Sequence, residues 1–401
     1  MILKDKLREI VKLQREELKR QNTGIPRELI KKIDFNSSHA IIISGIRRCG
    51  KSTLLRQIMK KTSKFYYFNL EDSRANDFEL ADFEKLNKIF KEDYGEQKNY
   101  FFDEIQNVPG WEKFIRRLQD NGKKVFITGS NASLLSKELG TRLTGRHLTY
   151  ELFPFSFIES LELKKENPSL EKFQDYLNKG GFPEYLKYEN NEILQQVFKD
   201  IIIRDIVARY GLRSTNVVKE LALYLITNTS KEFTHNQLRK IFEVGSTNTI
   251  TSYISYYEES YLLFTIPQFN YSYKKQLVNA KKIYAIDTGL IKANTASFSE
   301  DKGRILENSV FLKLRRKYKE IYYFKEKYEC DFVIKEKGEI TQAYQVCYEL
   351  NEHNQNREIN GLKEAMKKFK LKKGIILTLE QKDEFENISV IPAYEWMKNK
   401  Q

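Results

Sequence analysis

A run of eight residues near the N-terminus constrains the fold of this chain more than any other feature. The run GIRRCGKS, residues 45–52, fits the pattern G-x-x-x-x-G-K-[ST] and lies between an apolar segment, 39–44, and an amphipathic one, 51–61. Glycines let the backbone curl so that its N–H groups point at phosphate oxygens, and the following helix adds partial positive charge. The motif therefore predicts a strand, a phosphate-binding loop and a helix, in that order.

Each residue type in this loop has an expected role. Lys51 is expected to reach the β- and γ-phosphates, and Ser52 to offer its hydroxyl to Mg²⁺. The alternative is a plain glycine turn before an amphipathic helix, which the strand-loop-helix context disfavours. The predicted nucleotide-binding residues are Gly45, Arg48, Cys49, Gly50, Lys51, Ser52 and Thr53.

A second segment points to the same chemistry. The apolar run 99–102 ends in Asp103 and Glu104. At the tip of a strand, Asp103 is expected to hold Mg²⁺ through its water shell, and Glu104 to polarise the attacking water as a general base. Charged strand ends are common, but with the glycine-rich loop they predict Mg²⁺-dependent hydrolysis of a nucleoside triphosphate.

Four further residues are candidates for the same reaction. The apolar run 125–128 ends in small polar residues, which would place Ser130 or Asn131 near the γ-phosphate; a cap for the next helix is the alternative. Arg142 and Arg146 lie among glycines, and one of them is a candidate arginine finger supplied by a neighbouring subunit of a homo-oligomer. The alternative is that both are ordinary surface arginines.

The order of apolar runs indicates the domain organisation. A helix over 4–22 and a second over 26–33 are expected before strands and helices alternate up to about residue 154, a pattern typical of a parallel α/β sheet. Residues 168–228 read as helical, and 231–300 as short helices followed by a tyrosine-rich hairpin. A last α/β segment follows. The predicted domains are 1–155, 156–300 and 301–401.

Composition limits the partners and the compartment. Lys and Arg total 69 against 55 Asp and Glu, a net charge of +14, which makes nucleic acid a candidate partner. No apolar run approaches the roughly 18 residues of a membrane span, and the first ten residues are too charged for a signal peptide. The three cysteines are too far apart for a disulfide framework. A soluble, cytoplasmic protein without membrane contact is expected.

Several segments together resemble a known family. They are GIRRCGKST, FFDEIQN, ITGSNASLLS, ELFPFSFIE, GGFPEY, IIIRDIVARY, KIYAIDTGL and GRILENSVFLKLRR. They resemble prokaryotic AAA+-type ATP-binding proteins that carry a C-terminal domain of unknown function. The resemblance implies an α/β fold with a P-loop AAA+-like ATPase domain, a helical and winged-helix middle domain, and a C-terminal α/β restriction-endonuclease-like domain. ATP rather than GTP as the nucleotide, and a nucleic-acid or defence-related role, rest on this resemblance.

The middle segment has the proportions of a helix-turn-helix. Its second helix, within 246–260, contains no Lys or Arg, so reading of DNA bases is disfavoured. Phosphate contacts from the hairpin are the remaining DNA-binding mode, and a winged helix used for protein packing is the alternative. The basic residues expected in that hairpin are Lys274, Lys275, Lys281 and Lys282.

The C-terminal segment departs from the nuclease pattern that the resemblance implies. An acid pair and an E-x-K strand would hold the metal, but the positions read Glu307, Asp331, Gln345 and Cys347. An amide is a poorer Mg²⁺ ligand than a carboxylate, and a thiol does not replace an ammonium group. A non-cleaving nuclease fold is expected. It retains a candidate DNA-binding face formed by Arg315, Arg316, Lys317 and Lys319.

These observations favour one function over two alternatives. The leading hypothesis is a Mg²⁺-dependent, ATP-hydrolysing AAA+-like ATPase whose nucleotide state is coupled to binding of DNA or another partner. The first alternative is a nucleotide-switched protein-interaction module with negligible turnover. The second is a metal-dependent nuclease.

Overall fold

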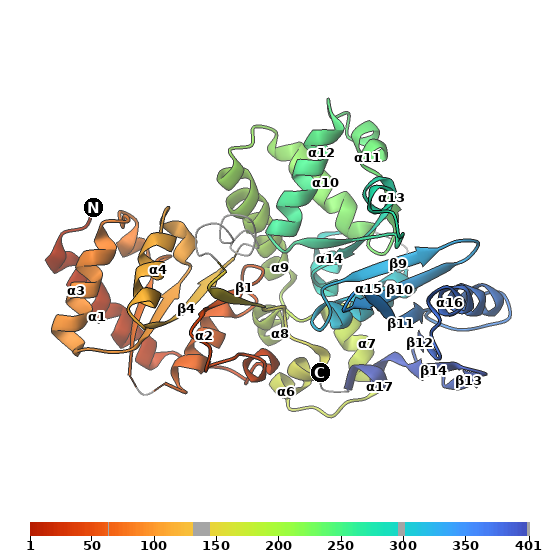
Figure 1. Cartoon of the computed structure of the whole chain (residues 1–401), viewed down its shortest axis with the longest axis horizontal. Helices are drawn as coiled ribbons and strands as arrows, with labels where there is room; N and C mark the ends of the chain where they lie inside the picture. The colour runs from red at the N-terminus through yellow and green to blue at the C-terminus, as the bar shows by residue number, and fades with distance from the viewer. Residues whose placement is uncertain (63, 131–144, 296–300, 399–401) are drawn as a thin grey trace. The chain divides into compact units, whose positions relative to one another are not determined.

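The computed structural model describes residues 1–62, 64–130, 145–295 and 301–398. The chain forms two compact units, Met1–Leu152 and Phe153–Gln401 (Figure 1). The second unit contains both of the domains predicted after residue 155, and the division of that unit near residue 300 stays a prediction. Of the helices in the described ranges, none has the length and apolar character that a membrane span needs.

The first unit is built on a five-stranded parallel sheet in the order β2-β3-β4-β1-β5. The strands are β1 (Ala40–Ser44), β2 (Phe65–Asn69), β3 (Asn99–Asp103), β4 (Lys124–Gly129) and β5 (His147–Glu151). Strands β1 and β4 are buried throughout, as expected for the central strands of a parallel sheet. The predicted α/β fold is confirmed. Strand β5 was missed, because its residues are half-buried and form no apolar run.

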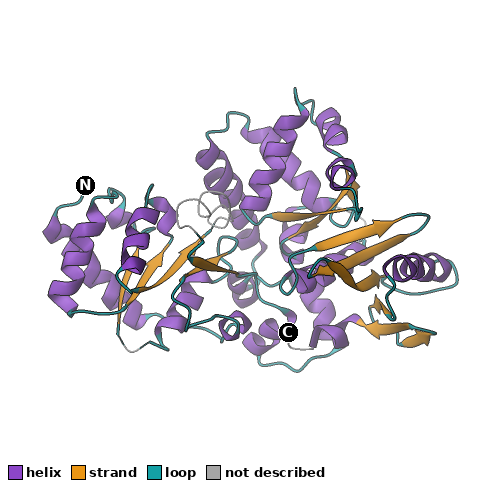
Figure 2. Cartoon of the chain, in the orientation of Figure 1, coloured by secondary structure: helices purple, strands orange, loops and turns teal. Residues whose placement is uncertain are grey.

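Helices pack against this sheet (Figure 2). They are α1 (Lys4–Arg20), α2 (Lys51–Met59), α3 (Asp82–Tyr94) and α4 (Glu112–Asp120), with short 3₁₀ turns at Glu28–Lys31, Ser73–Ala75 and Ile105–Asn107. Helices α1, α3 and α4 share one core cluster with the sheet. In that core, the rings of Tyr66 and Phe90 stack at 4.7 Å and those of Phe83 and Phe114 at 4.5 Å.

One predicted helix of the first unit is wrong. Residues 26–33 form only the single 3₁₀ turn Glu28–Lys31. Arg27 has extended backbone, and its N–H donates to the side chain of Gln57 on α2 at 3.1 Å, so this part of the segment is bound to α2 and is not helical. The predicted helix over 4–22 is confirmed as α1, with Leu7, Ile10 and Val11 buried.

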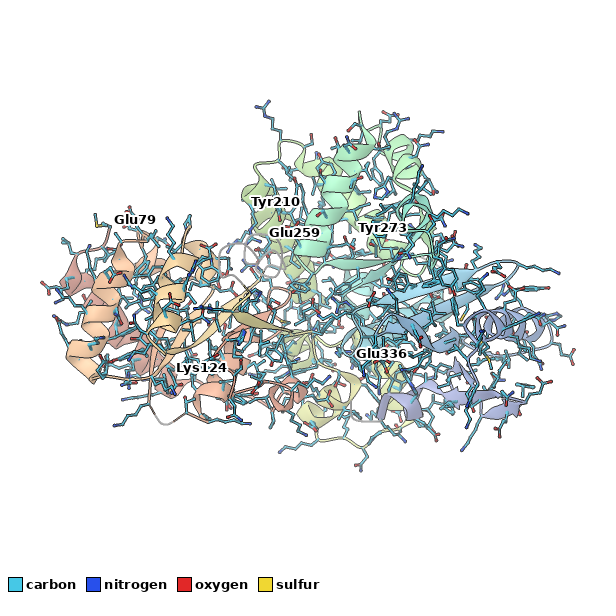
Figure 3. All side chains as sticks on the ribbon, in the orientation of Figure 1. Glu79, Lys124, Tyr210, Glu259, Tyr273 and Glu336 are labelled. Atoms are coloured by element: carbon cyan, nitrogen blue, oxygen red, sulfur yellow. The ribbon has the colours of Figure 1, made fainter. Side chains whose placement is uncertain are left out.

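The second unit begins with helices and a small sheet. The helices are α6 (Phe157–Lys164), α7 (Leu170–Lys179), α8 (Pro183–Tyr188), α9 (Asn191–Asp200), the π-helix η5 (Ile201–Ala208), α10 (Thr215–Thr227), α11 (His235–Ile241), α12 (Thr247–Glu259), α13 (Tyr273–Val278) and α14 (Thr288–Asn294). Strands β6 (Glu232–Phe233), β7 (Leu263–Pro267) and β8 (Lys281–Ala285) pair antiparallel in the order β6-β8-β7. The expected hairpin exists as β7 and β8, but its connection contains α13. Tyr273 on that helix is 73% exposed (Figure 3).

The last part of the second unit is a mixed six-stranded sheet in the order β13-β14-β12-β11-β10-β9. Its strands are β9 (Ile321–Lys325), β10 (Glu329–Glu336), β11 (Glu339–Val346), β12 (Gly374–Thr378), β13 (Asp383–Phe385) and β14 (Ile388–Pro392), and its helices are α15 (Lys302–Arg315), α16 (Gln355–Phe369) and α17 (Ala393–Lys398). Helix α16 packs closely on β10, since a Cβ on Gly361 would lie 2.0 Å from the Glu329 carbonyl oxygen.

A buried lysine joins the small sheet to the large one. Lys282 on β8 is 2% exposed, and its Nζ lies 2.7 Å from Glu329, 2.9 Å from Asp331 and 3.1 Å from Glu307. Burial opposes the charge on this lysine, but the carboxylates outweigh that effect and raise the pKa of Lys282. The stacked rings of Tyr284 on β8 and Phe311 on α15, 4.2 Å apart, extend the same contact.

We expect Lys282→Met to lower the free energy of unfolding of the second unit by about 3–5 kcal/mol, because removing one partner of a buried ion pair leaves charge unpaired. Lys281→Met is the matched control: Lys281 is half-buried, and a shift within about 0.5 kcal/mol is expected. Denaturant unfolding of the full chain measures both. Equal unfolding midpoints for the two variants would show that the cluster does not stabilise the unit.

Candidate functional site

The glycine-rich loop connects the end of β1 to the start of α2 in the first unit. Gly50 has φ of 101°, a left-handed conformation that favours glycine, and a Cβ on Gly45 would lie 2.1 Å from the Leu152 carbonyl oxygen. Cys49 is fully buried, and its Sγ donates to that same carbonyl at 3.4 Å. Burial raises the pKa of the Cys49 thiol, so this residue packs the loop as a neutral group.

Lys51 and Glu104 form a buried ion pair beside the loop. Their side chains are nearly inaccessible to solvent, and the Lys51 Nζ lies 3.4 Å from Glu104 Oε1. Lys51 also donates to the Ile46 carbonyl at 3.2 Å. Burial disfavours the Glu104 carboxylate, but the charges of Lys51 and Arg47 and a hydrogen bond from Gln106 together outweigh burial and hold the pKa of Glu104 below its usual value. Glu104 is therefore ionised, as a general base must be.

The backbone around Glu104 is held in an unusual conformation. Glu104 has φ of 50° and ψ of 49°, a left-handed geometry that non-glycine residues rarely adopt and that is often found at functional sites. Its N–H donates to Thr128 Oγ1 at 3.0 Å. The Ser130 N–H donates to Glu104 Oε2 at 3.2 Å, so the end of β4 orients this carboxylate.

The two predicted magnesium ligands lie side by side. The carboxylate of Asp103, at the end of β3, accepts hydrogen bonds from the hydroxyls of Thr128 and of Ser52, the second residue of α2. Burial and the neighbouring Glu104 raise the pKa of Asp103 to about 6. A hydroxyl and a carboxylate at one point are the oxygen donors that Mg²⁺ accepts in nucleotide sites, so these residues fit the predicted metal.

Arg27 is a buried cation at the loop that the sequence reasoning missed. It is 4% exposed, and its guanidinium donates to the Cys49 carbonyl at 2.8 Å. Gln57 on α2 donates to the carbonyls of Thr23 and Ile25, at 2.8 and 2.5 Å. The segment before the sheet is thus bonded to both the loop and its helix. Arg27 belongs to no motif, and only the folded chain places it at the loop.

The remaining predicted residues of the ATP site are less informative. Thr53 lies on α2, where its Oγ1 accepts from Arg56 at 3.0 Å, and Arg48 lies in the loop with φ of 63°. Arg146 precedes β5, and its guanidinium pairs with Asp120 at 2.6 Å. The glycine-rich loop follows β1, which runs parallel to β5. Arg146, at the start of β5, is therefore at the opposite end of these two strands, about 16 Å from the loop. Asn131 and Arg142 lie outside the described residues.

In the second unit, the predicted acid pair comes together. Glu307 on α15 and Asp331 in β10 both contact Lys282, as described above. The expectation that Lys282 contacts DNA phosphates is therefore wrong, because the side chain is buried against carboxylates. Lys274 and Lys275 lie on the short helix α13. The ammonium group in this cluster is that of Lys282, which comes from β8. The nuclease pattern would instead supply a lysine from β11, the strand that carries Gln345.

Gln345 and Cys347 do not complete a metal centre. The Gln345 amide donates to Glu358 at 2.6 Å, while its oxygen accepts from the Asp331 N–H at 3.2 Å. Burial raises the pKa of Cys347 to about 12, so the thiol stays neutral. Across the described ranges, no three His, Cys, Asp or Glu side chains are grouped so as to hold a metal ion.

The basic face predicted from residues at and just after the end of α15 is only partly exposed. Arg316 is half-buried, donates to the Pro154 carbonyl at 3.0 Å and lies 5.3 Å from the Phe153 ring centroid. Arg315 lies 5.3 Å from the ring of Phe264. These arginines pack against their own unit, which corrects the expectation of an exposed face; Lys317 and Lys319 are exposed.

Three family models match the chain. An AAA domain matches residues 37–161, a domain of unknown function (DUF8612) matches 170–301, and a domain of unknown function (DUF4143) matches 302–396. Two solved structures are similar at low TM-scores. AMPPCP-bound DnaA from Aquifex aeolicus shares 16% identity over 58% of this chain and 86% of that chain, with a TM-score of 0.30. CDC6P from Pyrobaculum aerophilum shares 13% over 66% and 88%, with a TM-score of 0.27.

Two relatives that match most of this chain show the family to which it belongs. An uncharacterized protein of Haemophilus influenzae is 29% identical over 91% of this chain and 96% of its own length. The uncharacterized protein MJ1544 of Methanocaldococcus jannaschii is 38% identical over 88% of this chain and 87% of its own length. The expected family resemblance is confirmed: the chain belongs to the same family as MJ1544, and in it an AAA domain is followed by two domains of unknown function.

Proposed function

We propose that this AAA-domain protein hydrolyses ATP in a Mg²⁺-dependent reaction at the glycine-rich loop, and that nucleotide state controls a partner bound by the second unit. One observation carries the proposal: Lys51, Ser52, Asp103 and Glu104 converge beside the loop, with Lys51 and Glu104 3.4 Å apart. Phosphate binding, metal binding and water activation are thus available at a single point.

In this proposal each side chain has one task. Lys51 binds the β- and γ-phosphates together with the loop N–H groups of Arg48, Cys49 and Gly50. Ser52 and Asp103 hold Mg²⁺, which neutralises phosphate charge when bound. As Lys51 turns to the phosphates, the Glu104 carboxylate becomes available to take a proton from the attacking water. Asn131, and Arg142 or Arg146 of a neighbouring copy, remain candidates for contact with the γ-phosphate.

The partner bound by the second unit is DNA in one version of this proposal and another protein in a second version. Four large apolar side chains on and beside α13 are more than half exposed: Tyr271, Tyr273, Leu277 and Val278. Burial of Lys282 also removes one positive charge from the surface expected to bind DNA. Contiguous exposed apolar side chains are typical of protein-binding surfaces. Metal-dependent DNA cleavage is not proposed, because Lys282 lies between Glu307 and Asp331.

We expect Glu104→Gln to keep ATP bound and to lower turnover by about 10²- to 10⁴-fold, because the variant lacks the general base. Lys51→Ala is expected to weaken ATP binding itself. Phosphate release and ATP affinity, measured with Mg²⁺, separate the two effects. Glu9→Gln is the control, since Glu9 is exposed on α1. Equal turnover in Glu104→Gln and the unsubstituted chain would exclude Glu104 as the base.

We expect Arg27→Met to raise the KM for ATP by about tenfold or more while kcat changes little, because a charge-assisted hydrogen bond to the loop backbone contributes about 1.5–3 kcal/mol. Arg27→Lys is expected to restore part of the loss. Arg116→Met, at an exposed position on α4, is the control. Steady-state kinetics measures both parameters. An unchanged KM for Arg27→Met would mean that Arg27 stabilises the unit without positioning the loop.

A further inference from the structure

The second unit contains a cavity of about 810 Å³ that no motif predicted. Its walls come from α7, the end of α10, α14, the start of α15 and the segment that follows β11. Ligand-binding cavities in proteins commonly measure about 300–1,000 Å³. The cavity is therefore large enough to hold a nucleotide-sized molecule.

The charge of its walls is strongly one-sided. Four basic side chains, Lys231, Lys292, Lys302 and Arg304, line the cavity together with a single carboxylate, Asp301. Arg304 pairs with Asp301 at 2.8 Å. Most other lining side chains are amides and hydroxyls. The lining therefore attracts an anion that also accepts hydrogen bonds.

Two of the lysines are held in place by neutral groups. The Lys231 Nζ donates to Asn228 Oδ1 at 3.0 Å, and the Lys292 Nζ donates to Asn178 Oδ1 at 2.6 Å. The Asn228 oxygen orients the Lys231 ammonium group without cancelling its charge. Within the part of the chain that the structure describes, neither Lys231 nor Lys302 forms an ion pair, so both charges are available to a bound anion.

An aromatic side chain completes the lining. The Lys302 Nζ lies 5.9 Å from the ring centroid of Tyr348, which is half-buried in the cavity wall. Lys302 is also the first residue of α15, where the helix N-terminus adds partial positive charge. Basic side chains that bind phosphate, next to a ring on which a base stacks, are the combination used by single-strand nucleic-acid sites.

We propose that this cavity binds a phosphate-bearing nucleotide, either free or at the end of a nucleic-acid strand. Lys231 and Lys302 bind the phosphate, and Tyr348 contacts the base. The site is separate from the glycine-rich loop and does not depend on ATP hydrolysis there. It also gives the second unit an anionic ligand that the buried Lys282 and the packed Arg316 do not bind.

The test uses the full chain carrying Lys51→Ala, so that the glycine-rich loop does not contribute. Two probes are titrated: AMP by calorimetry, and a 5′-phosphorylated single-stranded oligonucleotide by fluorescence anisotropy. The double variant Lys231→Gln, Lys302→Gln is compared with Lys219→Gln, Lys367→Gln, which removes the same charge from exposed positions outside the cavity. We expect at least about tenfold weaker binding for the first pair alone, because each lost phosphate contact weakens binding.

The two probes distinguish the sources of the ligand. Loss of AMP binding alone identifies a free nucleotide, and loss of oligonucleotide binding identifies a strand end. The proposal is overturned if neither probe binds the Lys51→Ala chain, or if both double variants bind equally well. Thermal unfolding and the two single variants, Lys231→Gln and Lys302→Gln, separate a lost contact from a misfolded unit. The same titrations without Lys51→Ala provide a second reading if that variant does not fold.

Discussion

The buried ion pair between Lys51 and Glu104 is the interaction on which the proposed chemistry of the first unit depends. Two opposite charges, each almost inaccessible to solvent, are 3.4 Å apart at the carboxyl ends of parallel strands. The pair helps to keep Glu104 ionised despite its burial. It also holds Lys51, the proposed phosphate-binding residue, next to Glu104, the proposed base. A parallel sheet brings the two together because β1 and β3 both end at this edge.

Much of this site follows from local sequence pattern. The glycine-rich loop, the strand before it and the two carboxylates after 99–102 are each encoded within a few residues, and the structure places all of them as expected. Arg27 and Lys282 could not be found in this way. Arg27 reaches the loop only because Gln57 holds the preceding segment against α2. Lys282 has the sequence context of an exposed hairpin, and only strand pairing turns it toward Glu307 and Asp331.

In the second unit, too, the folded chain places basic residues differently from what the sequence pattern suggested. Basic residues counted along the sequence suggested two DNA-binding surfaces, but Lys282, Arg315 and Arg316 use their charge to pack the unit. The cavity between α7 and α15 instead gathers lysines that are widely separated in the sequence. Net charge suggested an anionic ligand, and tertiary structure determines which cations are accessible to one.

We propose that the first unit hydrolyses ATP with Mg²⁺ held beside Lys51 and Glu104. Phosphate release by the purified full chain, followed with ATP as Mg²⁺ is titrated in from a chelated state, tests this proposal. We expect release that requires both ATP and Mg²⁺ and saturates with each. Absence of release at every Mg²⁺ concentration, or release that persists unchanged in the chelator, would contradict it.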